Sequence, residues 1–400
     1  VYGYSCQETG RDNLFYGGSV SGTRIIYPAG KVGVVYKKDG NSQQFYFGHD
    51  DDITCMDVDM PSGRFACTGQ RGSEPCVKMW NIDTATEIMK MPRAHRGAII
   101  DVKFNRTGTR ICSVGMGNEF DPSYTLAVYC ASSRAAVGAD WAGGTALLMA
   151  TQKCGVEAIM VAHWIDRVAS SNAFDIFIGR QKSVQFWRQE DPKTLTSTKG
   201  IFDRAARVQP QCAAACIGDA LVTGCANGQL YVWAGSKVRR VVPAHRGMVC
   251  SMQVVGPGGE KMVTGSRDGT VKIWDRALEI VRTFDMKQMA SQQCVRPYVR
   301  AVCMDRTMER IVVGLASSDI YEICYASGSA TLLSRGHFEG EVWGLAPHPT
   351  DPDKVATSGD DNTVRIWNSS LHELEQVANV DAPCRAIEWS PQGDLIGLGT

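Results

Sequence analysis

Residue types that could perform acid–base chemistry gather around one stretch of the chain, residues 264–275. Thr264, Ser266 and Asp268 precede Trp274 in this stretch, and His245 lies upstream of it. A histidine, a hydroxyl and a carboxylate are the parts of a nucleophilic triad, in which the acid orients the base and the base activates the hydroxyl. A single-site enzyme is therefore the first hypothesis to weigh.

A second copy of this set argues against catalysis. His337, Ser358 and Trp367 recur with similar spacing, and the carboxylate is supplied by Asp360 or its neighbour Asp361. A catalytic centre would not repeat along the chain, whereas a structural unit would. We therefore interpret both sets as buried polar networks that run from indole N–H to hydroxyl, imidazole and carboxylate. We predict no catalytic residue, no cofactor and no metal site.

The elements that position these residues are short strands. A strand ends at Thr264–Ser266, a tight turn forms at Asp268-Gly269, and a second strand alternates apolar and polar residues up to Trp274. Comparable third strands end at intervals near the 40–45-residue period of propeller repeats. Their last residues are Tyr36, Trp80, Tyr129, Trp187, Trp233, Trp274, Ile323 and Trp367. The widest interval predicts an insertion within 131–144, a stretch rich in Ala and Gly.

This repeat is typical of the WD-repeat β-propeller, an all-β fold. Seven regular units run from Gly48-His49 to Trp367, so we predict a seven-bladed propeller over 48–370. Residues 371–400 read as the start of a second, incomplete propeller, and we expect the chain to be part of a longer protein. The aromatic-rich segment 1–47 is either one irregular blade or a packing wedge.

Composition narrows the classes of partner. Lys plus Arg and Asp plus Glu both number 42, so the formal net charge is zero, which does not favour nucleic acid. No long apolar run indicates a membrane segment. Small basic clusters in loops are candidate sites for a protein partner. They comprise Arg93, Arg96, Lys237, Arg239, Arg240 and Arg246.

The chain contains 15 cysteines. Many of them lie inside apolar strand-like runs, where a thiol behaves as a small hydrophobic group. Their odd number and the absence of paired C-x-x-C spacing favour neither disulfides nor a zinc site. A reducing compartment, the cytoplasm, is the interpretation that fits.

Several strings resemble one family, the echinoderm microtubule-associated protein-like (EMAP-like) proteins. Val1-Tyr2-Gly3-Tyr4 with 11–16 (Arg-Asp-Asn-Leu-Phe-Tyr) is similar to the family's HELP motif, although Ser5–Gly10 and Gly17-Gly18-Ser19 depart from its usual spacing. The similarity covers essentially all 400 residues, and further family-like strings occur along the chain. They begin at Gly48, Ala66, Lys199, Gly336 and Glu341.

The resemblance implies a tandem pair of propellers with the HELP segment packed between them. It also implies binding to tubulin or microtubules, and a place on the cytoskeleton that includes cilia and axonemes. Other cytoskeletal or axonemal proteins are further expected partners. We expect a non-enzymatic scaffold that binds through propeller loops and faces. The alternative is a soluble WD-repeat adaptor that binds peptides without microtubules.

Overall fold

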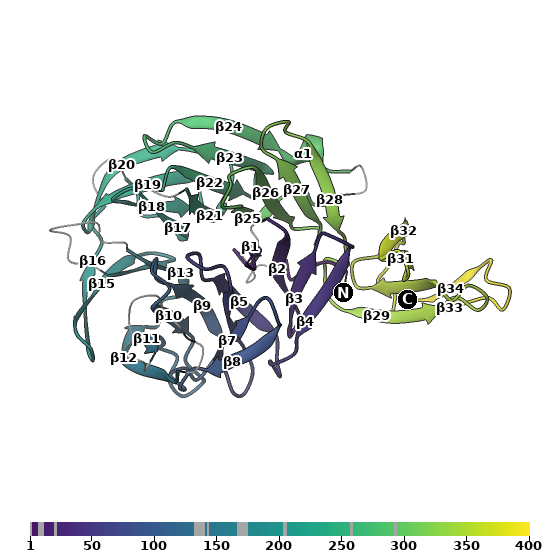
Figure 1. Cartoon of the computed structure of the whole chain (residues 1–400), viewed down its shortest axis with the longest axis horizontal. Helices are drawn as coiled ribbons and strands as arrows, with labels where there is room; N and C mark the ends of the chain where they lie inside the picture. Colours follow the sequence, from purple (N-terminus) through teal and green to yellow (C-terminus); the bar gives the residue numbers. More distant parts are fainter. Residues whose placement is uncertain are drawn as a thin grey trace.

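A ring of antiparallel sheets dominates the computed structural model (Figure 1). The structure describes residues 2–6, 12–19, 22–131, 141, 144–165, 175–202, 206–256, 259–291 and 294–400. The predicted insertion within 131–144 lies largely outside the described residues, as does Arg11 of the HELP-like string. The only helix in the described ranges is α1 (Met286–Met289).

Seven four-stranded sheets form the ring, and each is a meander whose first strand lies at the centre. We number these blades 1 to 7 in chain order. Blade 1 contains β1 (Phe15–Gly17), β2 (Arg24–Ala29), β3 (Val32–Lys37) and β4 (Ser42–Tyr46). Blade 2 contains β5 (Ile53–Val58), β6 (Phe65–Gln70), β7 (Val77–Asn81) and β8 (Thr86–Lys90). Blade 3 contains β9 (Ile99–Phe104), β10 (Arg110–Gly115), β11 (Tyr124–Ala131) and β12 (Ala146–Gly155).

The remaining blades repeat this pattern. Blade 4 contains β13 (Ile159–Trp164), β14 (Ile176–Arg180), β15 (Val184–Asp191) and β16 (Thr194–Lys199). Blade 5 contains β17 (Gln211–Ile217), β18 (Ala220–Cys225), β19 (Gln229–Ala234) and β20 (Lys237–Pro243). Blade 6 contains β21 (Val249–Val255), β22 (Lys261–Ser266), β23 (Thr270–Trp274) and β24 (Ile280–Asp285). Blade 7 contains β25 (Val299–Met304), β26 (Arg310–Leu315), β27 (Ile320–Cys324) and β28 (Ala330–Ser334).

A second unit lies outside the ring (Figure 1). It contains one four-stranded sheet and a hairpin that packs beside its first strand. The sheet is β29 (Val342–Pro347), β30 (Lys354–Gly359), β31 (Thr363–Asn368) and β32 (Glu373–Asn379), and the hairpin is β33 (Ala386–Trp389) with β34 (Ile396–Gly399).

This grouping differs from the expected boundaries at 47/48 and 370/371. Residues 15–46 form a complete blade, because β1 packs against β5 on one side and β25 on the other. One continuous apolar core joins blades 1, 2 and 7, and it includes Ile26, Trp80 and Cys303. Since blade 1 already closes the ring, the unit that ends at Trp367 has no place in it and begins the second unit instead.

Residues 2–6 lie at the junction of the ring and the second unit. The Tyr2 ring stacks on Trp367 with ring centroids 4.1 Å apart. The Tyr4 backbone exchanges two hydrogen bonds of 2.9 Å with the Ser318 side chain of the β26–β27 turn. The HELP-like string is therefore divided: its first residues form the junction, and Phe15-Tyr16 open a blade.

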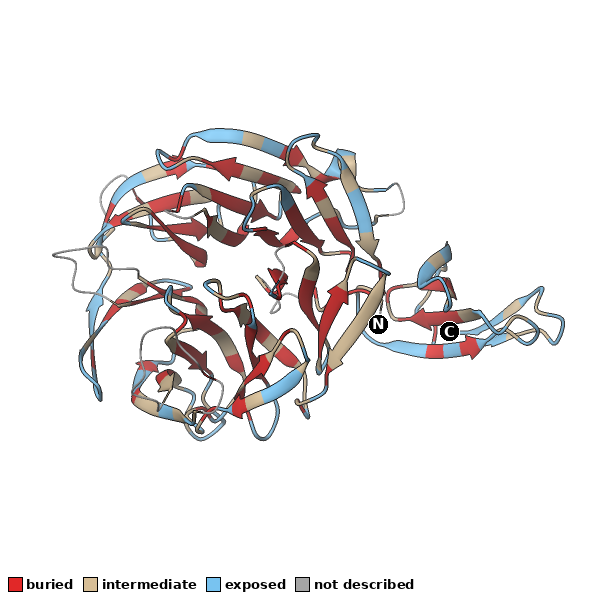
Figure 2. Cartoon of the chain, in the orientation of Figure 1, coloured by how far each residue is buried: buried red, intermediate tan, exposed pale blue. Residues whose placement is uncertain are grey.

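Residues near the centre of the ring are more buried than residues at its outer edge (Figure 2). Inner strands such as β25 are buried at every residue, whereas outer strands such as β16 expose five of six. Apolar clusters fill the spaces between neighbouring blades. Because both faces of each inner sheet are covered, the inner strands read as nearly continuous apolar runs.

Candidate functional site

The polar set of blade 6 is assembled as a buried chain of hydrogen bonds. The Trp274 indole N–H donates to Thr264 Oγ1 at 2.9 Å, and His245 Nε2 lies 2.8 Å from the same oxygen. His245 Nδ1 faces Thr270 Oγ1 at 2.9 Å and Asp268 Oδ2 at 3.4 Å. The network is complete when His245 carries its proton on Nδ1, so that Nε2 accepts from the threonine hydroxyl.

The electrostatics of this set favour a neutral histidine beside an ionised acid. Burial lowers the pKa of His245. Burial also acts to raise the pKa of Asp268, but hydrogen bonds from His245, Thr270 and the Arg246 backbone outweigh it and hold that pKa below its usual range. Thr264 is wholly buried and already hydrogen-bonded, so its hydroxyl cannot meet a substrate. The arrangement can hold a blade together but cannot carry out nucleophilic catalysis.

Ser266 lies beside this chain rather than in it. Its hydroxyl donates to the Gly247 carbonyl at 3.0 Å and accepts from the Asp268 backbone at 3.1 Å. Of the two hydroxyls that the sequence offered, Thr264 is therefore the link between indole and imidazole. Ser266 fixes the loop that carries His245.

The second unit builds the same chain from partly different residues. The Trp367 indole donates to Thr357 Oγ1 at 2.7 Å, and His337 Nε2 lies 2.9 Å from that oxygen. His337 Nδ1 lies 2.9 Å from Asp361 Oδ1. Thr357 thus takes the place expected for Ser358, and of the two candidate carboxylates Asp361 rather than Asp360 joins the chain.

Strand alternation explains this correction. Successive side chains of a strand point to opposite faces, so Ser358 points away when Thr357 points toward Trp367. Ser358 is buried with no hydrogen-bond partner among the described residues. Asp360 instead accepts from the Glu341 backbone and from the Trp343 indole, both at 3.0 Å. It stabilises the loop before β29.

Two further blades, 2 and 5, keep the hydroxyl and vary what surrounds it. In blade 2, His49 contacts Thr68 at 2.7 Å and Gln70 at 2.6 Å, so an amide replaces the carboxylate. In blade 5, Trp233 donates to Thr223 at 2.9 Å, and Thr223 in turn donates to Gln211. Gln211, the first residue of β17, therefore replaces the histidine as the partner of the hydroxyl. The sequence signal for it was weak, because only the Thr-Gly and terminal Trp of that blade match the repeat.

Blade 3 carries the least complete network of those with a histidine. His95 Nε2 lies 2.6 Å from Ser113 Oγ, and Tyr129 replaces the tryptophan, with its hydroxyl 3.5 Å from Ser113. His95 Nδ1 has no partner within the described part of the chain. Burial lowers the pKa of His95 to about 4, so the imidazole is neutral.

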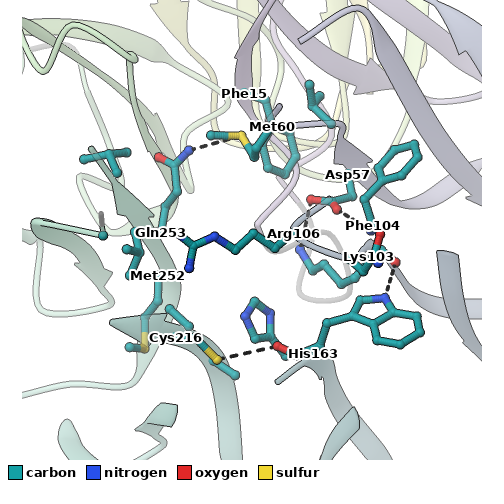
Figure 3. Close-up of a pocket in the computed structure, with 18 of the residues that line it drawn as sticks. Phe15, Asp57, Met60, Lys103, Phe104, Arg106, His163, Cys216, Met252 and Gln253 are labelled. Atoms are coloured by element: carbon teal, nitrogen blue, oxygen red, sulfur yellow. Dashed lines mark hydrogen bonds and ion pairs between the residues drawn. The ribbon is translucent and has the colours of Figure 1, made fainter. Parts of the chain in front are cut away.

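The centre of the ring holds a cavity of about 480 Å³ (Figure 3). Lys103, on β9, lies in its wall and is buried. Its ammonium group donates to Asp12 at 2.8 Å and lies 3.7 Å from Asp57 on β5. Asp12 also accepts from Ser251 on β21 at 2.7 Å. One carboxylate of the N-terminal segment therefore links inner strands of blades 3 and 6.

Burial and charge act on these groups in opposite directions. Burial acts to lower the pKa of Lys103, but Asp12, Asp57 and Asp101 raise it well above its usual range. Burial raises the pKa of Asp57 to about 7, and Lys103 offsets this only in part. The short contact to Asp12 marks it as the principal partner of Lys103. Burial and the nearby Lys103 lower the pKa of His163 to about 4.

Polar side chains of the inner strands also join one blade to the next. Asp57 accepts from the Phe104 backbone and Asp101 from the Ala162 backbone, each at 2.8 Å. Gln253 accepts from the Met304 backbone at 2.7 Å. These charged and amide groups are satisfied inside the ring, as buried polar groups must be.

The candidate basic residues do not form one patch. All six are exposed. Arg93 and Arg96 lie in the loop between blades 2 and 3. Lys237, Arg239 and Arg240 lie on the outer strand of blade 5, where Arg240 pairs with Glu279 at 3.6 Å. Arg246 follows His245 in the next loop.

The cysteines are unpaired thiols, and of the fifteen only Cys324 is exposed while Cys130 and Cys294 are half-buried. In the described ranges no group of three or more His, Cys, Asp or Glu side chains could hold a metal ion. No helix in the described part of the chain is long and apolar enough to cross a membrane.

Fold and network together define a WD-repeat β-propeller. Sequence comparison agrees, because the family described as the first β-propeller of echinoderm microtubule-associated protein matches residues 42–323. The WD domain, G-beta repeat, matches 328–368. Since the first match covers more than half of the chain, the chain belongs to the echinoderm microtubule-associated protein family.

Individual relatives match along the whole chain. Echinoderm microtubule-associated protein-like 2 of Mus musculus is 28% identical over 415 residues, which are 100% of this chain and 58% of the relative. The ciliary WD repeat-containing protein ctxp80 of Euplotoides octocarinatus is 26% identical over 417 residues, 96% of this chain and 51% of the relative. The 77 kDa echinoderm microtubule-associated protein of Lytechinus variegatus is 24% identical, over 100% of this chain and 56% of the relative. The chain spans a little over half the length of these relatives.

Proposed function

We propose that this chain is the propeller-bearing part of a microtubule-associated scaffold that binds tubulin and has no catalytic activity. The observation that carries the proposal is the family match over 42–323, together with relatives named for microtubule association along the full chain. A relative named as ciliary supports a place in cilia or axonemes as well as on cytoplasmic microtubules.

The geometry supports a binding role through its surface. The His, Thr and Asp side chains that could do chemistry are used inside the blades, where they satisfy one another. What remains for partners is the rigid ring with its loops, and binding residues are commonly carried on loops held by such a scaffold. A standard interface of about 1,600 Å² fits on one face of a propeller.

The six basic residues are the proposed contacts with tubulin. Because they lie on separate parts of the rim, we treat Arg93 with Arg96 and Lys237 with Arg239 as two independent candidate surfaces. Exposed charges act mainly on encounter and are screened by salt. Binding through either surface should therefore weaken as salt is added.

Co-sedimentation with polymerised tubulin tests the proposal. We expect the 400-residue chain to pellet with microtubules at low salt and less so at high salt. Neutralising the contacting pair, either Arg93→Gln with Arg96→Gln or Lys237→Gln with Arg239→Gln, should reduce the bound fraction. The exposed Lys31→Gln, in the β2–β3 turn, is the matched control and should have no effect. If the chain stays in the supernatant at every tubulin concentration, the proposal fails and a soluble WD-repeat adaptor becomes the better description.

A further inference from the structure

Blade 4 keeps the third-strand tryptophan but lacks the acceptor that the indole has elsewhere. In the other units with this tryptophan, the indole N–H donates to a threonine of the second strand. These pairs are Trp80–Thr68, Trp233–Thr223, Trp274–Thr264 and Trp367–Thr357. In blade 4 the register places Ile178 where the threonine would be. Trp187 is 4% exposed, and its indole nitrogen has no hydrogen-bond partner among the described residues.

Blade 7 lacks the same hydroxyl without this consequence. Its second strand has Val313 at the matching position, and its third strand has Ile323 in place of the tryptophan. Both side chains pack in one apolar cluster. A buried donor left without an acceptor weakens a folded unit, whereas apolar groups that replace both partners need not. Blade 4 therefore contains a destabilising buried donor that blade 7 avoids.

Two more buried nitrogens of blade 4 are unpaired within the described part of the chain. They are Nδ1 of His163 on β13 and Nε of Arg180 on β14. Arg180 uses its Nη2 group instead, which donates to the Cys154 carbonyl and, at 2.6 Å, to Gln185. The first three strands of blade 4 thus each carry one buried nitrogen without a hydrogen bond, a kind of group that is rare in folded proteins.

The outer part of blade 4 is weakly held. β16 exposes five of its six residues, compared with four of seven in β20 and three of six in β24. The connection before β13 does not reach the tryptophan either. Its Glu157 accepts from the Ser183 hydroxyl of the β14–β15 turn at 2.6 Å, whereas His245 of blade 6 contacts the threonine. The β15–β16 hairpin therefore depends mainly on the ladder between β14 and β15.

We propose that blade 4 is the point at which the ring opens, by local detachment of the β15–β16 hairpin from β14 while the other blades stay closed. Local opening takes the least free energy where few apolar side chains are buried, as in β16. The unpaired indole of Trp187 lowers that free energy further, because opening gives its N–H access to water. Detachment frees the edge of β14, and unpaired strand edges accept further strands. This opening does not depend on microtubule association.

Native-state hydrogen exchange of the 400-residue chain tests the proposal. Amides of β15 and β16 should have protection factors about tenfold lower than amides of β19 and β20, the matching strands of blade 5. The measurement uses the wild-type protein, so it does not depend on whether a variant folds. Equal or greater protection in blade 4 would overturn the proposal.

Two matched substitutions test the cause of the opening. Trp187→Phe and Trp233→Phe remove the same indole, but only Trp233 loses a hydrogen bond, the one to Thr223. Trp233→Phe should therefore raise the equilibrium constant for unfolding about fivefold more than Trp187→Phe does, as measured by chemical denaturation. Equal effects of the two substitutions would contradict the assignment of an unpaired donor to blade 4.

Restoring the hydroxyl provides the converse test. Ile178→Thr supplies an acceptor to the Trp187 indole, whereas Val313→Thr in blade 7 buries a hydroxyl where the third strand offers no indole. Ile178→Thr should lower the midpoint of denaturation less than Val313→Thr, although it removes more apolar volume. It should also raise the protection of β15 relative to β19. A larger loss of stability for Ile178→Thr, with no gain in protection, would overturn the proposal.

Discussion

Blades 6 and 3 perform the same structural task with different completeness. In blade 6, both nitrogens of His245 have partners, and Thr264 joins the histidine to Trp274. In blade 3, His95 uses one nitrogen, and Tyr129 stands where the tryptophan would be. Both blades nevertheless sit in one ring, and most of each inner strand is buried: four of six residues in β9 and five of seven in β21.

The comparison shows which part of the network the blades that carry it share. A hydroxyl at the middle of the second strand is present in both blades, and also in blades 2 and 5 as Thr68 and Thr223. The carboxylate, the indole and even the histidine are replaced in one blade or another. In these four blades the hydroxyl therefore links the strands, whereas blades 4 and 7 have the apolar Ile178 and Val313 at the matching position.

The largest expected effect comes from removing the third-strand aromatic of the complete blade. Trp274 is 1% exposed, so Trp274→Ala should lower the free energy of unfolding by about 3–5 kcal/mol. Chemical denaturation monitored by circular dichroism would measure it. Phe120→Ala, at a side chain 93% exposed, is the control and should stay within about 0.5 kcal/mol. A Trp274→Ala protein as stable as the control would contradict the blade assignment.

The unsatisfied histidine of blade 3 should make stability depend on pH. The pKa of His95 is lowered by burial to about 4, against about 6.5 when unfolded. Above pH 6.5 both states are neutral; as the pH falls toward 4, only the unfolded chain gains the proton, so stability is lost. The loss attributable to His95 is about 3 kcal/mol by pH 4.

His95→Gln isolates this contribution, because a glutamine amide does not titrate and can still accept a hydrogen bond from the Ser113 hydroxyl. Between pH 6.5 and 4, the variant should lose less stability than the wild type. Asp57, whose pKa burial raises to about 7, acts in the opposite direction, but it is common to both proteins and cancels. His372→Gln, at an exposed position, controls for the loss of a histidine. Parallel pH curves for His95→Gln and wild type would show that His95 is not buried in neutral form.

The smallest of the three effects compares the two hydroxyls. Thr264→Val leaves both the Trp274 indole and His245 Nε2 without a partner, and should cost about 2 kcal/mol. Ser113→Ala removes one strong contact, to His95, and should lower the free energy of unfolding by about 1 kcal/mol. Thr283→Val, exposed on the outer strand of blade 6, serves as the reference. Equal losses at Thr264 and Ser113 would mean that the completeness of the network does not set its strength.

Much of the repeat could be predicted from local pattern. The Thr-Gly-Ser strand end, the Asp268-Gly269 turn and Trp274 identify strands whose positions in the sheet the structure reproduces. The choice between Thr357 and Ser358 could not be made this way, because adjacent residues of a strand differ only in the face they occupy. Asp12 was missed altogether, since its partners Lys103 and Ser251 lie far away in the chain.

Sequence by itself determined the unit of this protein: a four-stranded antiparallel sheet built from short alternating strands, tight Gly turns and a buried polar set. Those features depend on neighbours a few residues apart. Only the tertiary structure decided which units close the ring, since β1 finds β5 and β25 as partners across a long stretch of chain. The same applies to burial: inner strand β25 is buried throughout, while β29 exposes four of its six residues. A strand's local pattern specifies which faces it offers, and the packing of distant blades decides which faces are covered.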